Sequence, residues 1–419
     1  MDIWLSEAEE GKLSTAVMID LRAGFDVVNH SLLILKLKQY GCDDKALAWF
    51  TNYLSNRYQC VQVESALSDI LPVPWGVPQG SILGPLLFLI FLNELPEVIK
   101  NRNEAEEASA DGHIVVFVDD NTPTFSDKNP INLLEKTQQA CDKVAHWFGL
   151  NDLTCSGEKT KLLVVGTRAN RLAKLAIVDP ELVVCGDVVK ETTSEKLLGV
   201  VINNTATWHH HLHGDADNPG LLPTLSKRVG MLRKLRKVTP DRKFNQLVSG
   251  IFTSKMMFGA TVWGGVWDIP GVQGDNIRKT LIGKSDMRKL QVLQNKVLRL
   301  QTRMPYGTPT SNLLAKANQL SVHQLIAYYS MTKVYKIISS KQPHHHYKRL
   351  VTEDIVGPGT RSLQEKRIEF KLSIGRGSFF YQASRLWAAL PDNVKRSNKV
   401  ETFIRACRKW TTENILVKR

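Results

Sequence analysis

The sequence has no hydrophobic run long enough to cross a membrane. Its longest apolar stretch, Ile82 to Leu92, is interrupted by Gly84 and Pro85. Because a transmembrane helix needs about 20 consecutive apolar residues, this stretch predicts a buried helix instead. The N-terminus also lacks the basic and then apolar pattern of a secretory signal, since three glutamates fall within its first ten residues. We therefore expect no membrane partner.

Cysteine is scarce, with six in 419 residues. No two have the C-x-x-C spacing of a zinc knuckle, and their positions indicate no disulfide framework. The sequence therefore predicts neither kind of cross-link, which is the usual condition of a reducing intracellular compartment. The six are Cys42, Cys60, Cys141, Cys155, Cys185 and Cys407.

Acidic residues become sparse in the second half of the chain. Residues 1–200 hold 18 Lys and Arg against 28 Asp and Glu, a net charge of −10, whereas the whole chain has a formal net charge of +14. Residues 201–419 therefore carry +24. A surplus of this size favours a polyanion, and nucleic acid in particular, as the partner of the second half. The alternative is that these bases only solvate exposed helix faces.

Two predicted strands end next to acids. Thr15 to Leu21 is a β-branched and apolar run that contains Asp20 near its end, and His113 to Val118 leads directly into Asp119 and Asp120. Carboxylates at the ends of apolar strands are costly unless a cation neutralises them, and Mg²⁺ is the natural candidate. The alternative for an isolated Asp-Asp pair is an ordinary turn.

The pair is not isolated, because six short motifs occur in the order found in one family. Together they resemble the reverse transcriptases of non-LTR (LINE-type, jockey-like) retrotransposons. The three longest are D-L-R-A-G-F-D-V-V-N-H at 20–30 (motif A), G-V-P-Q-G-S-I-L-G-P-L-L-F at 76–88 (motif B) and F-V-D-D at 117–120 (motif C). The others are Y-L-S-N-R at 53–57, E-K-T-K at 158–161 (motif D) and K-L-L-G-V at 196–200 (motif E).

The resemblance implies an α+β fold and a division into domains. We expect a right-hand polymerase palm, an antiparallel sheet with helices, over residues 15–210 with motifs A to E. A remnant of the fingers or a linker would occupy residues 1–14. A basic helical thumb would follow at 211–310, and a helical C-terminal region of unknown role at 311–419. The family carries fingers before motif A, and only 19 residues precede Asp20, so the resemblance predicts an N-terminally truncated element.

The thumb prediction also rests on helical spacing. Leu290, Leu293, Val297 and Leu300 recur at intervals that place them on one face of a helix. The neighbouring bases fall largely on other faces, so we expect them near phosphates.

The resemblance also implies a role for each acid. Asp20, Asp119 and Asp120 would bind two Mg²⁺ ions, or Mn²⁺ in their place, as the catalytic metal ligands. The backbone carbonyl of Leu21 would be a further ligand. Lys159 would protonate the leaving pyrophosphate, although an exposed surface lysine is an equally good reading of that residue.

Further roles concern the nucleotide and the primer. Phe25 would exclude a 2′-hydroxyl by its bulk, and Gln79 would contact the incoming nucleotide and the template-side backbone. Gly76 and Gly80 would allow close approach of nucleic acid where a Cβ would intrude. Leu198, Gly199 and Val200 would form a hairpin that holds the primer end.

The implied function is RNA-directed DNA polymerase, a nucleotidyltransferase that adds deoxynucleotides to a primer 3′-hydroxyl. Its partners would be an RNA template, a DNA primer and dNTPs. The alternative is a catalytically silent retrotransposon relic that only binds nucleic acid. The family further implies an intracellular, nuclear location.

Overall fold

The computed structural model describes residues 1–99, 112–266, 269, 282–355, 361–365 and 378–415. The chain folds into two compact units. The first, here called the sheet unit, is Gly11–Leu198, and the second, the helical unit, combines Met1–Glu10 with Gly199–Arg419. Sequence reasoning expected a domain boundary near residue 210 and grouped the first residues with the fingers, and that division into domains stays a prediction. The two compact units meet in sequence at Leu198 and Gly199, and the first ten residues group with the helical unit.

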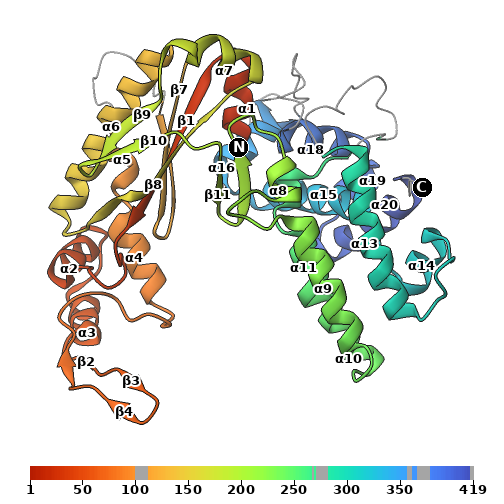
Figure 1. Cartoon of the computed structure of the whole chain (residues 1–419), viewed down its shortest axis with the longest axis horizontal. Coiled ribbons are helices and arrows are strands. Elements are labelled where there is room, and N and C mark those ends of the chain that lie inside the picture. Colours follow the sequence, from red (N-terminus) through yellow and green to blue (C-terminus); the bar gives the residue numbers. More distant parts are fainter. Residues whose placement is uncertain (100–111, 267–268, 270–281, 356–360, 366–377, 416–419) are drawn as a thin grey trace. The chain divides into compact units, whose positions relative to one another are not determined.

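A four-stranded antiparallel sheet is the frame of the sheet unit (Figure 1). Its strands stand in the order β6-β7-β1-β8, so the chain's first strand lies inside the sheet. They are β1 (Leu13–Leu21), β6 (Gly112–Phe117), β7 (Asp120–Asp127) and β8 (Cys155–Val165).

Helices pack against this sheet and build its core. The longest is α6 (Pro130–Leu150), which begins after the Asn129 side-chain cap and runs alongside the sheet in Figure 1. A hydrogen bond of 2.8 Å between the hydroxyls of Thr15 and Thr137 joins α6 to β1. The other helices of the sheet unit are α2 (His30–Gln39), α3 (Asp44–Leu54), α4 (Gly84–Leu92), α5 (Leu95–Val98), α7 (Arg168–Lys174) and a short 3-10 helix (Leu175–Ile177).

Residues 84–92 of the apolar run form helix α4, but the predicted burial is correct for one face only, because Ile82, Leu86 and Leu89 are exposed. Leu87, Phe88, Phe91 and Leu92 are all buried in the core of the sheet unit. Among the described residues, no helix combines the length and apolar character needed to cross a membrane.

The sheet unit also contains short strands outside the four-stranded sheet. The strand pairs β2–β5, β3–β4 and β9–β10 are each antiparallel. Their bounds are β2 (Tyr58–Gln59), β3 (Gln62–Val63), β4 (Ala66–Leu67), β5 (Leu71–Pro72), β9 (Glu181–Val184), β10 (Asp187–Lys190) and β11 (Ser194–Leu197).

The helical unit is organised around α15 (Val322–Ser340), which packs against α13, α18 and α20. Its capping box at Ser321 and Gln324 defines its start, and the Gln324 side chain also donates to the carbonyl of Ile415 at 2.8 Å. The Tyr335 ring stacks on Phe403 of α20 with centroids 4.0 Å apart. These contacts tie residues far apart in sequence into one core.

The helices and strands of the helical unit occur in the following order along the chain. They are α1 (Asp2–Glu9), β12 (Val200–Asn203), α8 (His209–His213), α9 (Leu221–Leu235), α10 (Asp241–Leu247), a π-helix (Val248–Thr253), α11 (Ser254–Met257), α12 (Ala260–Trp263), α13 (Lys284–Thr302), α14 (Thr310–Ala317), α15, α16 (His344–Leu350), β13 (Val351–Ile355), β14 (Arg361–Glu365), α18 (Phe379–Ala388), α19 (Asp392–Lys395) and α20 (Val400–Asn414).

The predicted α+β class, an antiparallel sheet with helices followed by a mostly helical region, is confirmed. The predicted helix at residues 290–300 lies within α13, where Leu290, Leu293 and Val297 are buried.

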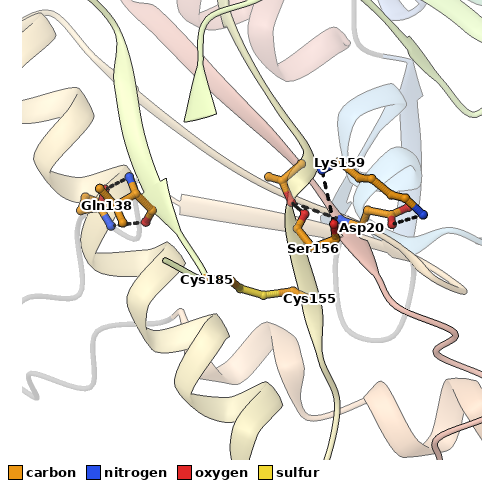
Figure 2. The surroundings of a disulfide bond; sticks show 8 residues. Asp20, Gln138, Cys155, Ser156, Lys159 and Cys185 are labelled. Carbon is orange, nitrogen blue, oxygen red and sulfur yellow. Dashed lines mark hydrogen bonds and ion pairs between the residues drawn. A yellow bond between two sulfur atoms is a disulfide. The ribbon is translucent and has the colours of Figure 1, made fainter. Parts of the chain in front are cut away.

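The prediction that the chain has no disulfide is wrong. Cys155 at the start of β8 is bonded to Cys185, which lies in the turn between β9 and β10 (Figure 2). Their Cα atoms are 6.4 Å apart, within the span that a disulfide can bridge. The pairing joins positions 30 residues apart, and such a long-range contact leaves no local spacing pattern in the sequence.

Candidate active site

Strand pairing brings two of the predicted acids together. In the antiparallel register of β1 and β7, Ile19 pairs with Asn121, so the residues beside them, Asp20 and Asp120, are also neighbours across the two strands. Ile19 and Asn121 are buried. Because side chains alternate between the two faces of a sheet, Asp20 and Asp120 lie on the opposite face, where both are partly or fully exposed.

The third acid is carried by the turn between β6 and β7. Phe117 pairs with Asp120, and the two residues between them, Val118 and Asp119, form the turn. Val118 has a φ of 60°, an unusual conformation for a β-branched residue. The turn thus holds Asp119 next to Asp120 at the end of the β6–β7 hairpin.

The three carboxylates affect one another electrostatically. The pKa of Asp120 is raised, first because partial burial penalises its charge and then because Asp119 and Asp20 add negative charge nearby. Lys159 lies close to the cluster, with its Nζ 3.9 Å from a carboxylate oxygen of Asp20. One exposed lysine beside three carboxylates leaves a surplus of negative charge.

This surplus fits a divalent cation. Within the part of the chain that the structure describes, no three His, Cys, Asp or Glu side chains already surround one point as metal ligands. Mg²⁺, however, is usually held by one or two carboxylates, with waters and substrate phosphates completing its shell. The donor set of Asp20, Asp119 and Asp120 is therefore chemically suitable for an ion that arrives with a phosphate ligand.

A pocket of about 380 Å³ borders the acids. Leu21, Phe25, Gln79 and Gly80, all predicted site residues of motifs A and B, line it, and so does one of the acids. The lining residues are Leu21, Ala23, Gly24, Phe25, Pro78, Gln79, Gly80, Pro85 and Asp119.

Phe25 is held firmly at this pocket. Its ring stacks on Phe88 of α4, with centroids 4.5 Å apart and an angle of 17° between the planes. The residue is half-buried and also packs against the core of the sheet unit. It therefore serves as both a pocket wall and a core contact.

Four hydrogen bonds join the loop after β1 to the loop before α4. The backbone N–H groups of Gly76 and Val77 donate to the carbonyls of Val28 and Phe25, each at 2.8 Å. A ring nitrogen of His30 lies 2.7 Å from the carbonyl oxygen of Gly76. Finally, Nε2 of Gln79 donates to Oδ1 of Asp26 at 2.8 Å.

Sequence reasoning missed Asp26 and His30, although both lie within the segment assigned to motif A. Gly76 is buried, and its added Cβ would lie 2.7 Å from the backbone oxygen of Asp26. Gly76 is therefore needed for close approach of protein backbone, and its contact with nucleic acid stays a prediction. Gly80 differs, because nothing lies within 4 Å of its added Cβ and it lines the pocket.

Comparison with known proteins gives this arrangement a family. A model of the family "Reverse transcriptase (RNA-dependent DNA polymerase)" matches residues 4–202, which include the strands, loops and acids described above. Residues 4–202 belong to the reverse transcriptases.

The relatives of this chain come from non-LTR retrotransposons. The RNA-directed DNA polymerase from the mobile element jockey of Drosophila melanogaster is 23% identical over 309 residues, covering 74% of this chain and 30% of that protein. A probable RNA-directed DNA polymerase from transposon BS of the same organism is 25% identical over 332 residues, covering 77% of this chain and 33% of that protein. The chain spans about a third of the length of these curated relatives.

Solved structures show only a weak likeness to this chain. Telomerase from Candida tropicalis in complex with a fragment of telomeric RNA is 12% identical, with a TM-score of 0.36, and covers 80% of this chain and 48% of that one. This score is too low to indicate a common overall fold.

The segment assigned to motif D lies directly beside Asp20 (Figure 2). Ser156 pairs with Asp20 across β1 and β8, where the register shifts between Met18 and Asp20. The Thr160 hydroxyl accepts from the backbone N–H of Asp20 at 3.5 Å and donates to the carbonyl of Ser156 at 2.7 Å. This local irregularity in the strand pair brings Lys159 within reach of the Asp20 carboxylate.

The residues predicted to hold the primer lie at the boundary of the two units. Leu198 and Gly199 form the turn between β11 and β12, with φ values of 47° and 83°. Leu198 is exposed, whereas Val200 is buried in the helical unit. An added Cβ at Gly199 would lie 2.8 Å from the ring of Phe258.

The basic residues of the helical unit divide into two groups. Arg228 and Arg236 serve the fold, because Arg228 donates to the carbonyl of Ile251 and Arg236 donates to the carbonyl of Leu300 and pairs with Asp241. Arg299 on α13 is likewise partly buried, and it donates to the carbonyl of Thr308. Nine others on α9, α10 and α13 are exposed. These are Lys227, Arg233, Lys234, Arg242, Lys243, Lys284, Arg288, Lys289 and Lys296.

Proposed function

We propose that the chain is an RNA-directed DNA polymerase that adds deoxynucleotides to the 3′-hydroxyl of a primer. The observation that carries this proposal is that the three acids lie beside the pocket whose walls include Phe25 and Gln79. Asp119 belongs to both features, since it lines the pocket and raises the pKa of Asp120.

Each group then has a task in phosphoryl transfer. Two Mg²⁺ ions, or Mn²⁺ in their place, would be held by Asp20, Asp119 and Asp120 and would supply charge neutralisation at the attacking and leaving oxygens. The Leu21 carbonyl is a further candidate ligand, since Leu21 lines the pocket. Lys159 would donate a proton to the departing pyrophosphate, and its position 3.9 Å from Asp20 supports this task.

The pocket would select the sugar and orient the nucleotide. The Phe25 ring is fixed by its stack on Phe88, so a ribose 2′-hydroxyl beneath it would meet a wall that cannot easily yield. Gln79 and Gly80 would contact the nucleotide from the opposite loop. The turn at Leu198, Gly199 and Val200 would hold the primer end.

The exposed bases of the helical unit would hold the RNA template and DNA primer through their phosphates. Such contacts position a duplex without reading its sequence. A chain that only binds nucleic acid is the less well supported alternative, because all three acids and the pocket are in place. We further propose an intracellular, nuclear location, in keeping with the non-LTR relatives.

A primer-extension assay tests the proposal. The full chain is incubated with poly(rA)/oligo(dT), dTTP and Mg²⁺, and the double variant Asp119→Asn and Asp120→Asn serves as the matched control. We expect extension by the wild-type chain and none by the variant, with both binding the hybrid. Binding without extension by the wild-type chain would instead support the silent relic.

A further inference from the structure

The Gln79 side chain shares a hydrogen bond with an acid that lies outside the metal site. Its Nε2 donates to Oδ1 of Asp26 at 2.8 Å, across 53 residues of sequence. Both side chains are exposed, and Gln79 lines the pocket beside Phe25. Resting on the proposed function, we infer that Asp26 is a positioning residue that sets the orientation of the Gln79 carboxamide for the incoming nucleotide.

The chemistry of the pair determines which end of the carboxamide faces Asp26. An ionised carboxylate can only accept hydrogen bonds, whereas a carboxamide has one donating and one accepting end. The donating NH₂ of Gln79 must therefore turn toward Asp26. The accepting oxygen Oε1 is then the end left to meet a hydrogen-bond donor of the nucleotide, such as a sugar hydroxyl. Without Asp26, the carboxamide could present either end and would sample several rotamers.

The backbone that carries Asp26 is rigidly placed. Its N–H donates to the carbonyl of Ala23 at 2.8 Å, and its Cα, C and O atoms lie within 2.9 Å of the point where Gly76 would carry a Cβ. The carbonyls of Phe25 and Val28, one on each side of Asp26 in the chain, accept the backbone hydrogen bonds of Val77 and Gly76. The backbone of the opposite loop therefore holds the Asp26 carboxylate in position to accept the hydrogen bond from Gln79.

The exposure of the pair argues for a role in binding and not in folding. A single hydrogen bond between exposed side chains adds little to stability, because water replaces either partner when it is lost. An orientation fixed in advance instead lowers the cost of ordering the side chain when a ligand binds. The loss of Asp26 should therefore affect nucleotide binding much more than melting.

The test is a double-mutant cycle in the full chain. Asp26→Ala, Gln79→Ala and the double variant are compared with the wild type by steady-state primer extension on poly(rA)/oligo(dT), varying dTTP. We expect each single variant to raise KM about 10-fold with a smaller change in kcat, which corresponds to about 1.4 kcal/mol. The double variant should match Gln79→Ala alone, because Asp26 acts through Gln79. Asp26→Asn, which keeps an accepting oxygen, should recover part of the loss.

A matched control lies on helix α6. Nε2 of Gln138 donates to Oδ1 of Asp142 at the same distance of 2.8 Å, also between exposed side chains. Asp142→Ala removes the same kind of bond away from the pocket, so its KM should equal that of the wild type, and the melting temperatures of Asp26→Ala and Asp142→Ala should agree.

The outcomes separate the two proposals. If Asp26→Ala leaves KM unchanged, or if the two single effects multiply to about 100-fold in the double variant, Asp26 does not position Gln79 and this inference fails while the polymerase stands. If the wild-type chain extends no primer, the proposed function fails and takes this inference with it.

Discussion

Gly76 and Gly80 provide a sharp test of how the two active-site loops are joined. Both have positive φ, 86° and 78°, so replacing either with alanine costs about 1–2 kcal/mol for the left-handed backbone. An added Cβ at Gly80 meets nothing within 4 Å, whereas one at Gly76 would lie 2.7, 2.8 and 2.9 Å from three backbone atoms of Asp26. Backbone cannot give way as a flexible side chain can, so Gly76→Ala must push the loops apart.

The extra cost at Gly76 follows from the bonds that this separation breaks. The N–H groups of Gly76 and Val77 would lose their bonds to Val28 and Phe25, each with a net value of about 0.5–1.5 kcal/mol. We therefore expect Gly76→Ala to destabilise this region by about 1–3 kcal/mol more than Gly80→Ala. The reduced backbone entropy of the unfolded chain affects both variants alike and cancels in the comparison.

Hydrogen–deuterium exchange measures this difference locally. A chain of two units has no single free energy of unfolding, so the exchange of peptides covering residues 20–30 and 76–92 is followed by mass spectrometry in each full-length variant. Gly76→Ala should accelerate exchange of both peptides about 10-fold or more relative to Gly80→Ala, since 1.4 kcal/mol corresponds to a factor of ten. Equal exchange in the two variants would refute the close contact between the loops.

Three further predictions concern the site and the disulfide. Phe25→Ala should admit ribonucleotides and largely spare dTTP incorporation, and unchanged sugar selectivity in a UTP-against-dTTP competition would remove its gating role. The folded state raises the pKa of Asp120, so the native chain binds this proton more tightly than the unfolded chain and loses stability as the pH rises through that pKa. Asp120→Asn should therefore raise the melting temperature at pH 7 without divalent cations. This gain should shrink below about pH 4, because the carboxyl is then protonated even in the unfolded chain. A gain in melting temperature that is independent of pH would contradict this reasoning. Cys155→Ser should destabilise the sheet unit by about 3–4 kcal/mol, as expected for a 30-residue separation. Cys185→Ser should have the same effect. If the wild-type melting temperature is the same with and without reductant, the disulfide contributes nothing to stability.

The sequence alone predicted the elements that depend on local pattern. Most of the apolar run at 82–92 forms a helix that is buried on one face, and the runs before Asp20 and Asp119 form strands. Alternation and helical spacing act over a few residues, so they can be read without knowing the rest of the chain. Resemblance to a family then identified Phe25, Gln79 and Gly80 as a group, and the structure places all three around one pocket.

Only the tertiary structure decided which distant residues meet. The bond between Cys155 and Cys185 joins the start of β8 to the turn between β9 and β10, and the pairing of Gln79 with Asp26 spans two loops. The same holds for Gly76, whose crowding comes from a backbone 50 residues earlier in the chain. Such contacts depend on strand register and on the packing of α4 against the sheet. Neither leaves a periodic trace in the sequence, because a contact between residues far apart in the chain is set by the folded backbone and not by neighbouring residues.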